Sequence, residues 1–147
     1  MPPNMPPHEV SLALFDRAHF PGVLALFAAE GWSYADDAER TWRALTAPGS
    51  KAVVALADEN VVGVAHALSD GEIQAFLAIL VVGAAHRRRG IGERLVREAF
   101  SRTEAQRIDL VSCADAFYET LGFRRMSAFR TSRDELGPGR PGGRQPT

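Results

Sequence analysis

Hydrophobic residues fall into short runs separated by glycine, proline and acidic residues, and each run predicts one element. Val10–Phe15 predicts a strand. A helix is predicted over Gly22–Glu30, directly after Pro21, because proline is accepted in the first turn of a helix. A second helix is predicted over Asp36–Leu45, and the Pro-Gly-Ser segment at 48–50 separates it from the next apolar run. The first third of the chain therefore predicts one strand and two helices.

The middle of the chain predicts strands. Lys51–Ala57 and Asn60–Ser69 are apolar runs joined at Asp58-Glu59-Asn60, which predicts a hairpin. A turn at Asp70-Gly71 precedes a further predicted strand, Glu72–Val82. We therefore expect three consecutive strands here.

The last third alternates between helices and strands. A helix over Gly90–Thr103 is indicated by apolar residues at helical spacing, namely Ile91, Leu95, Val96, Ala99 and Phe100. A strand is predicted over Arg107–Ser112, then a short helix over Ala114–Leu121 that Gly122 ends, and a last strand over Arg125–Thr131.

The predicted order β-α-α-β-β-β-α-β-α-β indicates an α/β (α+β) fold with a mixed, mostly antiparallel sheet and helices on both faces. The strands Glu72–Val82 and Arg107–Ser112 should form one parallel pair, because a helix connects them. Residues 10–136 are the expected domain. The proline- and glycine-rich ends, residues 1–9 and 137–147, are expected to be disordered tails.

The clearest chemistry lies between the strand Glu72–Val82 and the helix after it, where Arg87-Arg88-Arg89-Gly90-Ile91-Gly92 joins the two elements. The unpaired N–H groups of a first helical turn attract anions, and the helix dipole adds partial positive charge there. Glycine lets the backbone approach a ligand closely. The turn is therefore expected to bind a phosphorylated cofactor.

Two motifs resemble those of the GNAT N-acetyltransferase superfamily. Arg87-x-x-Gly90-x-Gly92 resembles the acyl-CoA signature Gln/Arg-x-x-Gly-x-Gly/Ala of that family. Phe117-Tyr118-Glu119-Thr120-Leu121-Gly122-Phe123 resembles its Phe-Tyr-x-x-x-Gly-Phe segment, and it follows at the expected distance. The resemblance is strong from about Gly71 to Phe123.

The resemblance implies transfer of an acetyl group from acetyl-CoA to a primary amine by direct attack in a ternary complex. It also implies that backbone N–H groups of the turn hold the pyrophosphate and that the preceding strand pairs with the pantetheine arm. Tyr118 would protonate the departing thiolate. The residues expected to bind the co-substrate are Leu80, Val81, Val82, Arg87, Arg88, Arg89, Gly90, Ile91 and Gly92.

The chain departs from the family pattern in its general base, the residue that would take a proton from the amine. Many relatives carry an acidic residue late in the strand before the CoA turn, whereas residues 76–80 contain no carboxylate. Glu72, Asp70 and His66 are the candidates, and Glu72 is the expected catalytic one, although it is also typical of a solvated residue at a strand start. His66 shares a strand face with apolar residues, which favours a structural role.

Composition restricts the other classes of function. The 147 residues carry a net charge of −1, which argues against broad nucleic-acid or membrane binding. The chain has one cysteine, no run long enough for a membrane span and no secretory leader, so a cytoplasmic location is expected. Spacings of histidine and acidic residues predict no metal site.

Other functions remain open. A dinucleotide-binding unit would need a third glycine after Gly92, and a phosphate-binding P-loop would need Gly-Lys-Ser/Thr. The strongest rival is a non-catalytic domain of the same fold that senses acyl-CoA. A small-molecule amine is the favoured acceptor, and a homodimer is possible. Trp32 and Tyr34 either line an acceptor pocket or cap the core.

Overall fold

The computed structural model describes residues 9–112 and 114–139, and the chain divides into two compact units at residue 113. Each unit is described by itself. In its described residues, the first unit contains a five-stranded sheet: β1 Val10–Leu14, β2 Ser50–Ala57, β3 Asn60–Ser69, β4 Gln74–Val82 and β5 Arg107–Leu110. Its α-helices are α1 Phe20–Ala29, α2 Ala38–Thr46 and α3 Ile91–Ser101, with 3₁₀ turns at Arg17–His19, Ser33–Asp36 and Ala84–His86.

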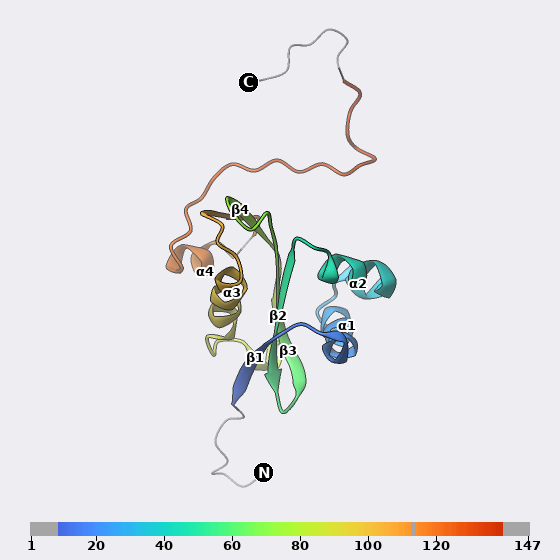
Figure 1. Ribbon diagram of the computed structural model, residues 1–147, viewed down its shortest axis with the longest axis vertical. Helices are drawn as coiled ribbons and strands as arrows, with labels where there is room; N and C mark the ends of the chain where they lie inside the picture. Colours follow the sequence, from blue (N-terminus) through green and yellow to red (C-terminus); the bar gives the residue numbers. More distant parts are fainter. Residues whose placement is uncertain (1–8, 113, 140–147) are drawn as a thin grey trace. The chain divides into compact units, whose positions relative to one another are not determined.

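The strands lie in the sheet in the order β1-β2-β3-β4-β5. All neighbours are antiparallel except β4 and β5, which are parallel and joined through α3. Figure 1 shows α1 and α2 on one face of the sheet and α3 on the other. The predicted mixed sheet, with helices on both faces and one parallel pair, is confirmed.

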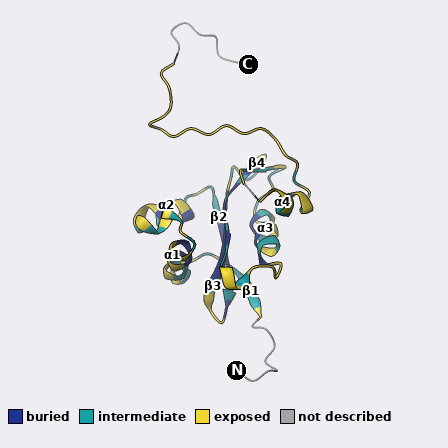
Figure 2. Ribbon diagram, turned by 180° about the vertical axis from the view of Figure 1, so that it is seen from behind, coloured by how far each residue is buried: buried dark blue, intermediate teal, exposed yellow. Residues whose placement is uncertain are grey.

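The middle parts of β2 and β3 are buried on both faces of the sheet, as their dark colour in Figure 2 shows. The α1/α2 face packs around Val23, Leu26, Phe27, Leu45, Ala52, Val54, Val64, Ile79 and Val81. On the other face, α3 buries Leu95 directly over β3. A Cβ atom on Gly63 would lie 2.9 Å from Cδ1 of Leu95, so glycine allows the helix to approach this closely.

A bulge lies in the middle of β4. Ala67 pairs with Leu77 and His66 pairs with Ile79, so Ala78 is an extra residue in β4. Pairing with β5 ends at the same level, at Leu77 and Leu110. A bulge bends and twists its strand, which gives a physical reason for the separation of β4 from β5 beyond this point.

Several predicted bounds change. The second helix begins at Ala38 rather than Asp36, because the side chain of Asp37 accepts the backbone N–H of Arg40 and caps it. Strand β4 begins at Gln74 rather than Glu72, because the preceding residues form a capped turn. The strand after α3 ends at Leu110 rather than Ser112.

The second unit contains the short helix α4, Asp115–Thr120, followed by Gly122 with φ of 93° as expected for a residue that ends a helix. The predicted strand Arg125–Thr131 is wrong, because residues 124–131 form neither strand nor helix. A strand exists only when a neighbour pairs with it, and the described residues of this unit contain no other strand. The predicted tails fall largely on residues 1–8 and 140–147, which lie outside the described residues.

Candidate active site

The turn between β4 and α3 has the geometry of an anion-binding helix start. Gly90 occupies the N-cap position with φ of 76°, a conformation that glycine adopts without strain. No side chain caps α3, and its first internal hydrogen bond is donated by the N–H of Arg94 to Gly90. The N–H groups of Ile91, Gly92 and Glu93 are therefore left for a ligand.

Arg88 also adopts a left-handed conformation, with φ of 65°. Few residues other than glycine do so, and the backbone is strained when an arginine occupies this region. Arg88 and Arg89 are exposed.

A carboxylate that the sequence did not single out holds this turn. Glu30, at the C-terminal end of α1, accepts the backbone N–H of Ala84 at 3.2 Å and pairs with the guanidinium of Arg87. Arg87 also donates to the carbonyl of Val82 at 3.1 Å. The Glu30 side chain is only 15% exposed. The expected phosphate ligand Arg87 thus braces the turn against α1, a contact across 57 residues that no local motif indicates.

Strand β4 has an unpaired edge beside the turn. The N–H of Gly83 donates to Val62 of β3, and N–H directions alternate along a strand, so the N–H of Val82 and of Leu80 point to the opposite edge. Within the first unit, β5 pairs with β4 only up to Leu77. Among the described residues, no strand pairs with the N–H groups of Leu80 and Val82, whereas Val81 is directed to β3.

The opposite end of β4 is built from carboxylates and amides. Oδ1 of Asp70 accepts the N–H groups of Glu72, Ile73 and Gln74 at 2.8–3.1 Å, and these bonds hold the pKa of Asp70 below its usual value. Asp70 is therefore a turn cap. Glu72 lies in this exposed turn, and β4 separates it from the Gly-Arg turn by roughly 26 Å.

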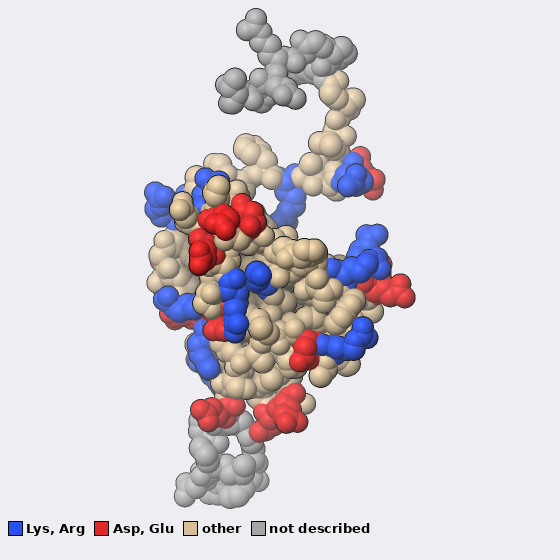
Figure 3. All heavy atoms as spheres, in the orientation of Figure 1, with Lys and Arg blue, Asp and Glu red and all other residues tan. Residues whose placement is uncertain are grey.

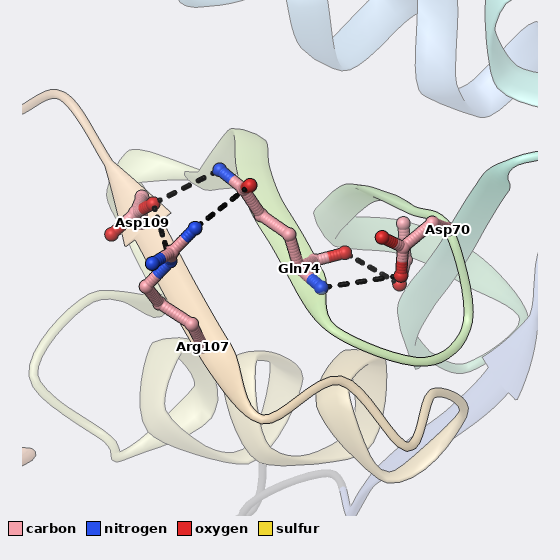
Figure 4. Close-up of polar contacts among 5 residues, drawn as sticks. Asp70, Gln74, Arg107 and Asp109 are labelled. Carbon is pink, nitrogen blue, oxygen red and sulfur yellow. Dashed lines mark hydrogen bonds and ion pairs between the residues drawn. The ribbon is translucent and has the colours of Figure 1, made fainter. Parts of the chain in front are cut away.

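Figure 4 shows a polar network across β4 and β5 at this end. The side-chain amide of Gln74 donates to Asp109 at 3.2 Å and accepts from Arg107 at 3.1 Å. Arg107 also lies 3.8 Å from the Asp109 carboxylate. A shallow hollow of about 370 Å³ lies beside the network, lined by Gly49, Leu68, Ser69, Asp70, Gln74, Ala75 and Phe76.

The contacts of His66 favour a structural role. Its side chain is buried, and its Nε2 lies 2.8 Å from the hydroxyl of Ser50. Ser50 uses its only hydroxyl proton to donate to the carbonyl of Ala44, so Nε2 of His66 carries the hydrogen of this contact. Burial lowers the pKa of His66, which keeps the ring neutral.

Tyr118 lies on α4 and is half-buried. Its ring contacts Phe117 and Phe123 edge-on, with centroids 4.9 and 5.6 Å away. Burial raises the pKa of the Tyr118 hydroxyl. The hydroxyl is therefore protonated at neutral pH, which is the state a proton donor needs.

The aromatic pair between the first two helices caps the core. Trp32 stacks on the buried ring of Phe27 at 6.0 Å, and Tyr34 meets both rings at 5.5 Å. Tyr34 keeps 43% of its surface exposed. Their packing role is confirmed by these contacts, and a role toward an acceptor stays a prediction.

The comparisons with known proteins agree with this geometry. The profile of the acetyltransferase (GNAT) domain matches residues 48–125, which include β4, the Gly-Arg turn and α4. The chain belongs to the GNAT acetyltransferase family. No curated protein matches its sequence.

Solved structures give the same fold. A protein of Deinococcus radiodurans R1 classed as an acetyltransferase is 30% identical, with a TM-score of 0.67 over 84% of this chain and 88% of that one. A GNAT-family acetyltransferase of Streptococcus pneumoniae TIGR4 is 26% identical, with a TM-score of 0.70 over 85% and 99%. The aminoglycoside N-acetyltransferase AAC(6')-Iy, solved with CoA, shares the fold at 16% identity and a TM-score of 0.70 over 85% and 94%.

Three further observations describe this GNAT protein. None of its described helices is long and apolar enough to cross a membrane. The described residues hold no group of three or more His, Cys, Asp or Glu side chains arranged for a metal ion. On the face shown in Figure 3, basic and acidic side chains are interspersed.

Proposed function

We propose that the protein is an N-acetyltransferase that moves an acetyl group from acetyl-CoA to a primary amine of a small molecule, by direct attack in a ternary complex. The observation that carries the proposal is the combination of an uncapped helix start at Gly90 with the free edge of β4 at Leu80 and Val82. The first suits a pyrophosphate and the second suits an amide-bearing arm that adds along a strand edge.

Binding of the co-substrate is divided among several residues. The N–H groups of Ile91 and Gly92 hold the pyrophosphate, and the exposed Arg88 and Arg89 add charge that salt can screen. Glu30 and Arg87 keep the turn in place. Acetyl-CoA supplies an acyl carbon activated as a thioester.

Backbone donors and one hydroxyl would serve the chemistry. The N–H groups of Leu80 and Val82 point to the open edge, where such a donor can stabilise negative charge on the acyl oxygen as the amine attacks. Tyr118, whose raised pKa keeps its hydroxyl protonated at neutral pH, is proposed to give its proton to the departing thiolate. Glu72 is the carboxylate first expected to receive the amine's proton.

The test is release of free CoA thiol from acetyl-CoA in the presence of a panel of small amines, with calorimetry of CoA binding beside it. We expect tight CoA binding and amine-dependent thiol release. Absence of CoA binding would overturn the proposal.

A second candidate rests on one specific observation, the absence of a carboxylate from residues 76–80 of β4. A domain that binds acyl-CoA and only senses it would need no base. Tight CoA binding without turnover of any amine would favour this sensor.

A further inference from the structure

The α1/α2 face of the sheet stays partly open at the N-terminal end of β4. Leu68 of β3, Phe76 of β4 and Asp109 of β5 lie directly opposite one another in the sheet register. Residues opposite in register point to one face. Leu68 lies four residues after Val64, which packs under α1 and α2, yet Leu68 is 42% exposed. This row, Leu68–Phe76–Asp109, thus places exposed apolar surface next to a carboxylate.

The carboxylate of Asp109 is held in a defined orientation with one oxygen free. Its Oδ2 accepts a hydrogen bond from the side-chain amide of Gln74, which joins β4 to β5 (Figure 4). The same oxygen lies 3.8 Å from Nε of Arg107, on the same strand. Within the described residues, no hydrogen bond or ion pair is formed by Oδ1 of Asp109. The side chain is 40% exposed, so a ligand can reach that oxygen.

The surroundings favour a cation. Asp70, Glu72 and Asp109 carry negative charge at this end of the sheet, and Arg107 carries positive charge. The hollow of about 370 Å³ is lined by Leu68 and Phe76 of the row and by Gln74, whose amide donates to Asp109. Apolar atoms form most of its lining. An ammonium group on an apolar body matches both properties.

We propose that the Leu68–Phe76–Asp109 row binds the acceptor, a cationic primary amine whose ammonium group contacts Oδ1 of Asp109 and whose apolar body packs on Leu68 and Phe76. The inference rests on the proposed acetyl transfer. It also assigns Asp109, rather than Glu72, as the carboxylate that replaces the acidic residue missing from β4. Asp109 is oriented by two partners, whereas the described residues provide no partner for the Glu72 carboxylate.

The position along the strands suits the reaction. Asp109 is level with Phe76, two residues or roughly 7 Å from Ala78, where the open edge of β4 begins. The ammonium group gives up two protons, of which one passes to solvent and the other ends on sulfur. The lone pair of the amine nitrogen forms the C–N bond. The C–S bond breaks, and the electron pair of that bond stays on sulfur.

The experiment is a titration of the ¹⁵N-labelled full chain, with CoA present, by hexylamine, methylamine and hexanol. Hexylamine should shift the amide signals of Leu68, Phe76 and Asp109 and bind at least about tenfold more tightly than hexanol, which lacks the charge, or methylamine, which lacks the apolar body.

Variants separate the contributions. Asp109→Asn should weaken hexylamine binding, and raise KM where hexylamine is acetylated, by about ten- to a hundredfold, with CoA affinity unchanged. Asp109→Glu should restore part of the loss. Phe76→Ala should weaken hexylamine but not methylamine. Glu104→Gln, which removes an equal charge from an exposed residue just before β5, should change neither.

The outcomes distinguish this inference from the proposed function. Binding at the row that depends on Asp109, without any acetyl transfer, supports the amine site and contradicts the transferase. The amine site is overturned if hexylamine does not bind or binds elsewhere. It is also overturned if hexylamine loses affinity in Glu72→Gln rather than in Asp109→Asn. Normal acetyl transfer in Asp109→Asn, with unchanged KM, also overturns it.

Discussion

The two ends of β4 differ in how they are built. At the C-terminal end, one continuous segment of chain forms a turn that leads into α3. The backbone N–H groups after Gly90 are left uncapped there. At the N-terminal end, side chains from separate strands meet, and Gln74, Arg107 and Asp109 connect β4 to β5. The first end carries the family's motif, and the second carries residues that belong to no motif identified in the sequence. A site made by one local segment is visible in sequence, whereas a site assembled from several strands is not.

The largest expected effect belongs to Tyr118→Phe, which tests the proposed proton transfer to the thiolate. Tyr118→Phe keeps the ring and most of its packing, so Tm and CoA affinity should change little. Positioned proton transfer contributes roughly 10²–10⁴-fold, and kcat with acetyl-CoA should fall by about 10²-fold, because a thiolate leaves tolerably even unprotonated.

A thioester with a more acidic thiol is the control for Tyr118→Phe, and the loss of kcat should shrink with it. An unchanged kcat with acetyl-CoA, under conditions where chemistry limits turnover, would leave Tyr118 as a packing residue.

Gly90→Asn tests the C-terminal end of β4 directly. Asparagine tolerates left-handed backbone, and a Cβ at Gly90 meets no atom within 4 Å, so the fold should survive. The side chain would enter the space where the pyrophosphate should lie, and CoA affinity by calorimetry should fall by at least about tenfold.

Gly71→Asn is the matched control, because Gly71 has φ of 87° and equally open surroundings at the other end of β4. It should bind CoA normally. Equal CoA affinity in both variants would remove the pyrophosphate from the Gly90 turn.

Glu30→Ala tests whether contacts with the end of α1 hold the Gly-Arg turn in place. The change removes the bonds to Ala84 and Arg87, and CoA affinity should fall by about three- to fivefold, since partly exposed ion pairs contribute about 1 kcal/mol or less. Glu30→Gln keeps an acceptor for the Ala84 N–H and should lose less. Tighter CoA binding in Glu30→Ala would show that its charge opposes the phosphates more than its contacts help.

The smallest effect at neutral pH concerns His66, beside the bulge between the two ends. Burial lowers its pKa from 6.5, so the unfolded chain binds the proton more readily than the folded one. The stability contributed by neutral His66 is full above pH 6.5 and is lost as pH falls through the folded-state pKa. The free energy of unfolding should decrease by up to about 1.4 kcal/mol per pH unit in that window.

His66→Gln is the comparison for this pH dependence, because its amide can still donate to Ser50 but does not titrate. Urea unfolding from neutral to mildly acidic pH should show a shallower decline for the variant. Parallel declines for both proteins would assign the loss of stability to other groups.

Local patterns in the sequence determined much of the fold. The hairpin Lys51–Ala57 and Asn60–Ser69 was predicted within one residue of β2 and β3, because apolar runs around an acidic turn leave few alternatives. The parallel pairing of β4 and β5 followed from the helix between them. The predicted strand Arg125–Thr131 was wrong, since its residues cannot show whether a partner edge exists.

The sequence by itself determined the family and the place of the Gly-Arg turn, because motif, strand and helix start lie within one stretch from Leu80 to Gly92. Only the tertiary structure decided that Glu30 braces this turn, that the Ala78 bulge coincides with the end of the β4–β5 pairing, and that Asp109 lies level with Phe76. These relations depend on strand register and on contacts between residues far apart in the chain. Local propensity and residue spacing carry information only about residues close together in the sequence. They therefore do not specify contacts between distant segments.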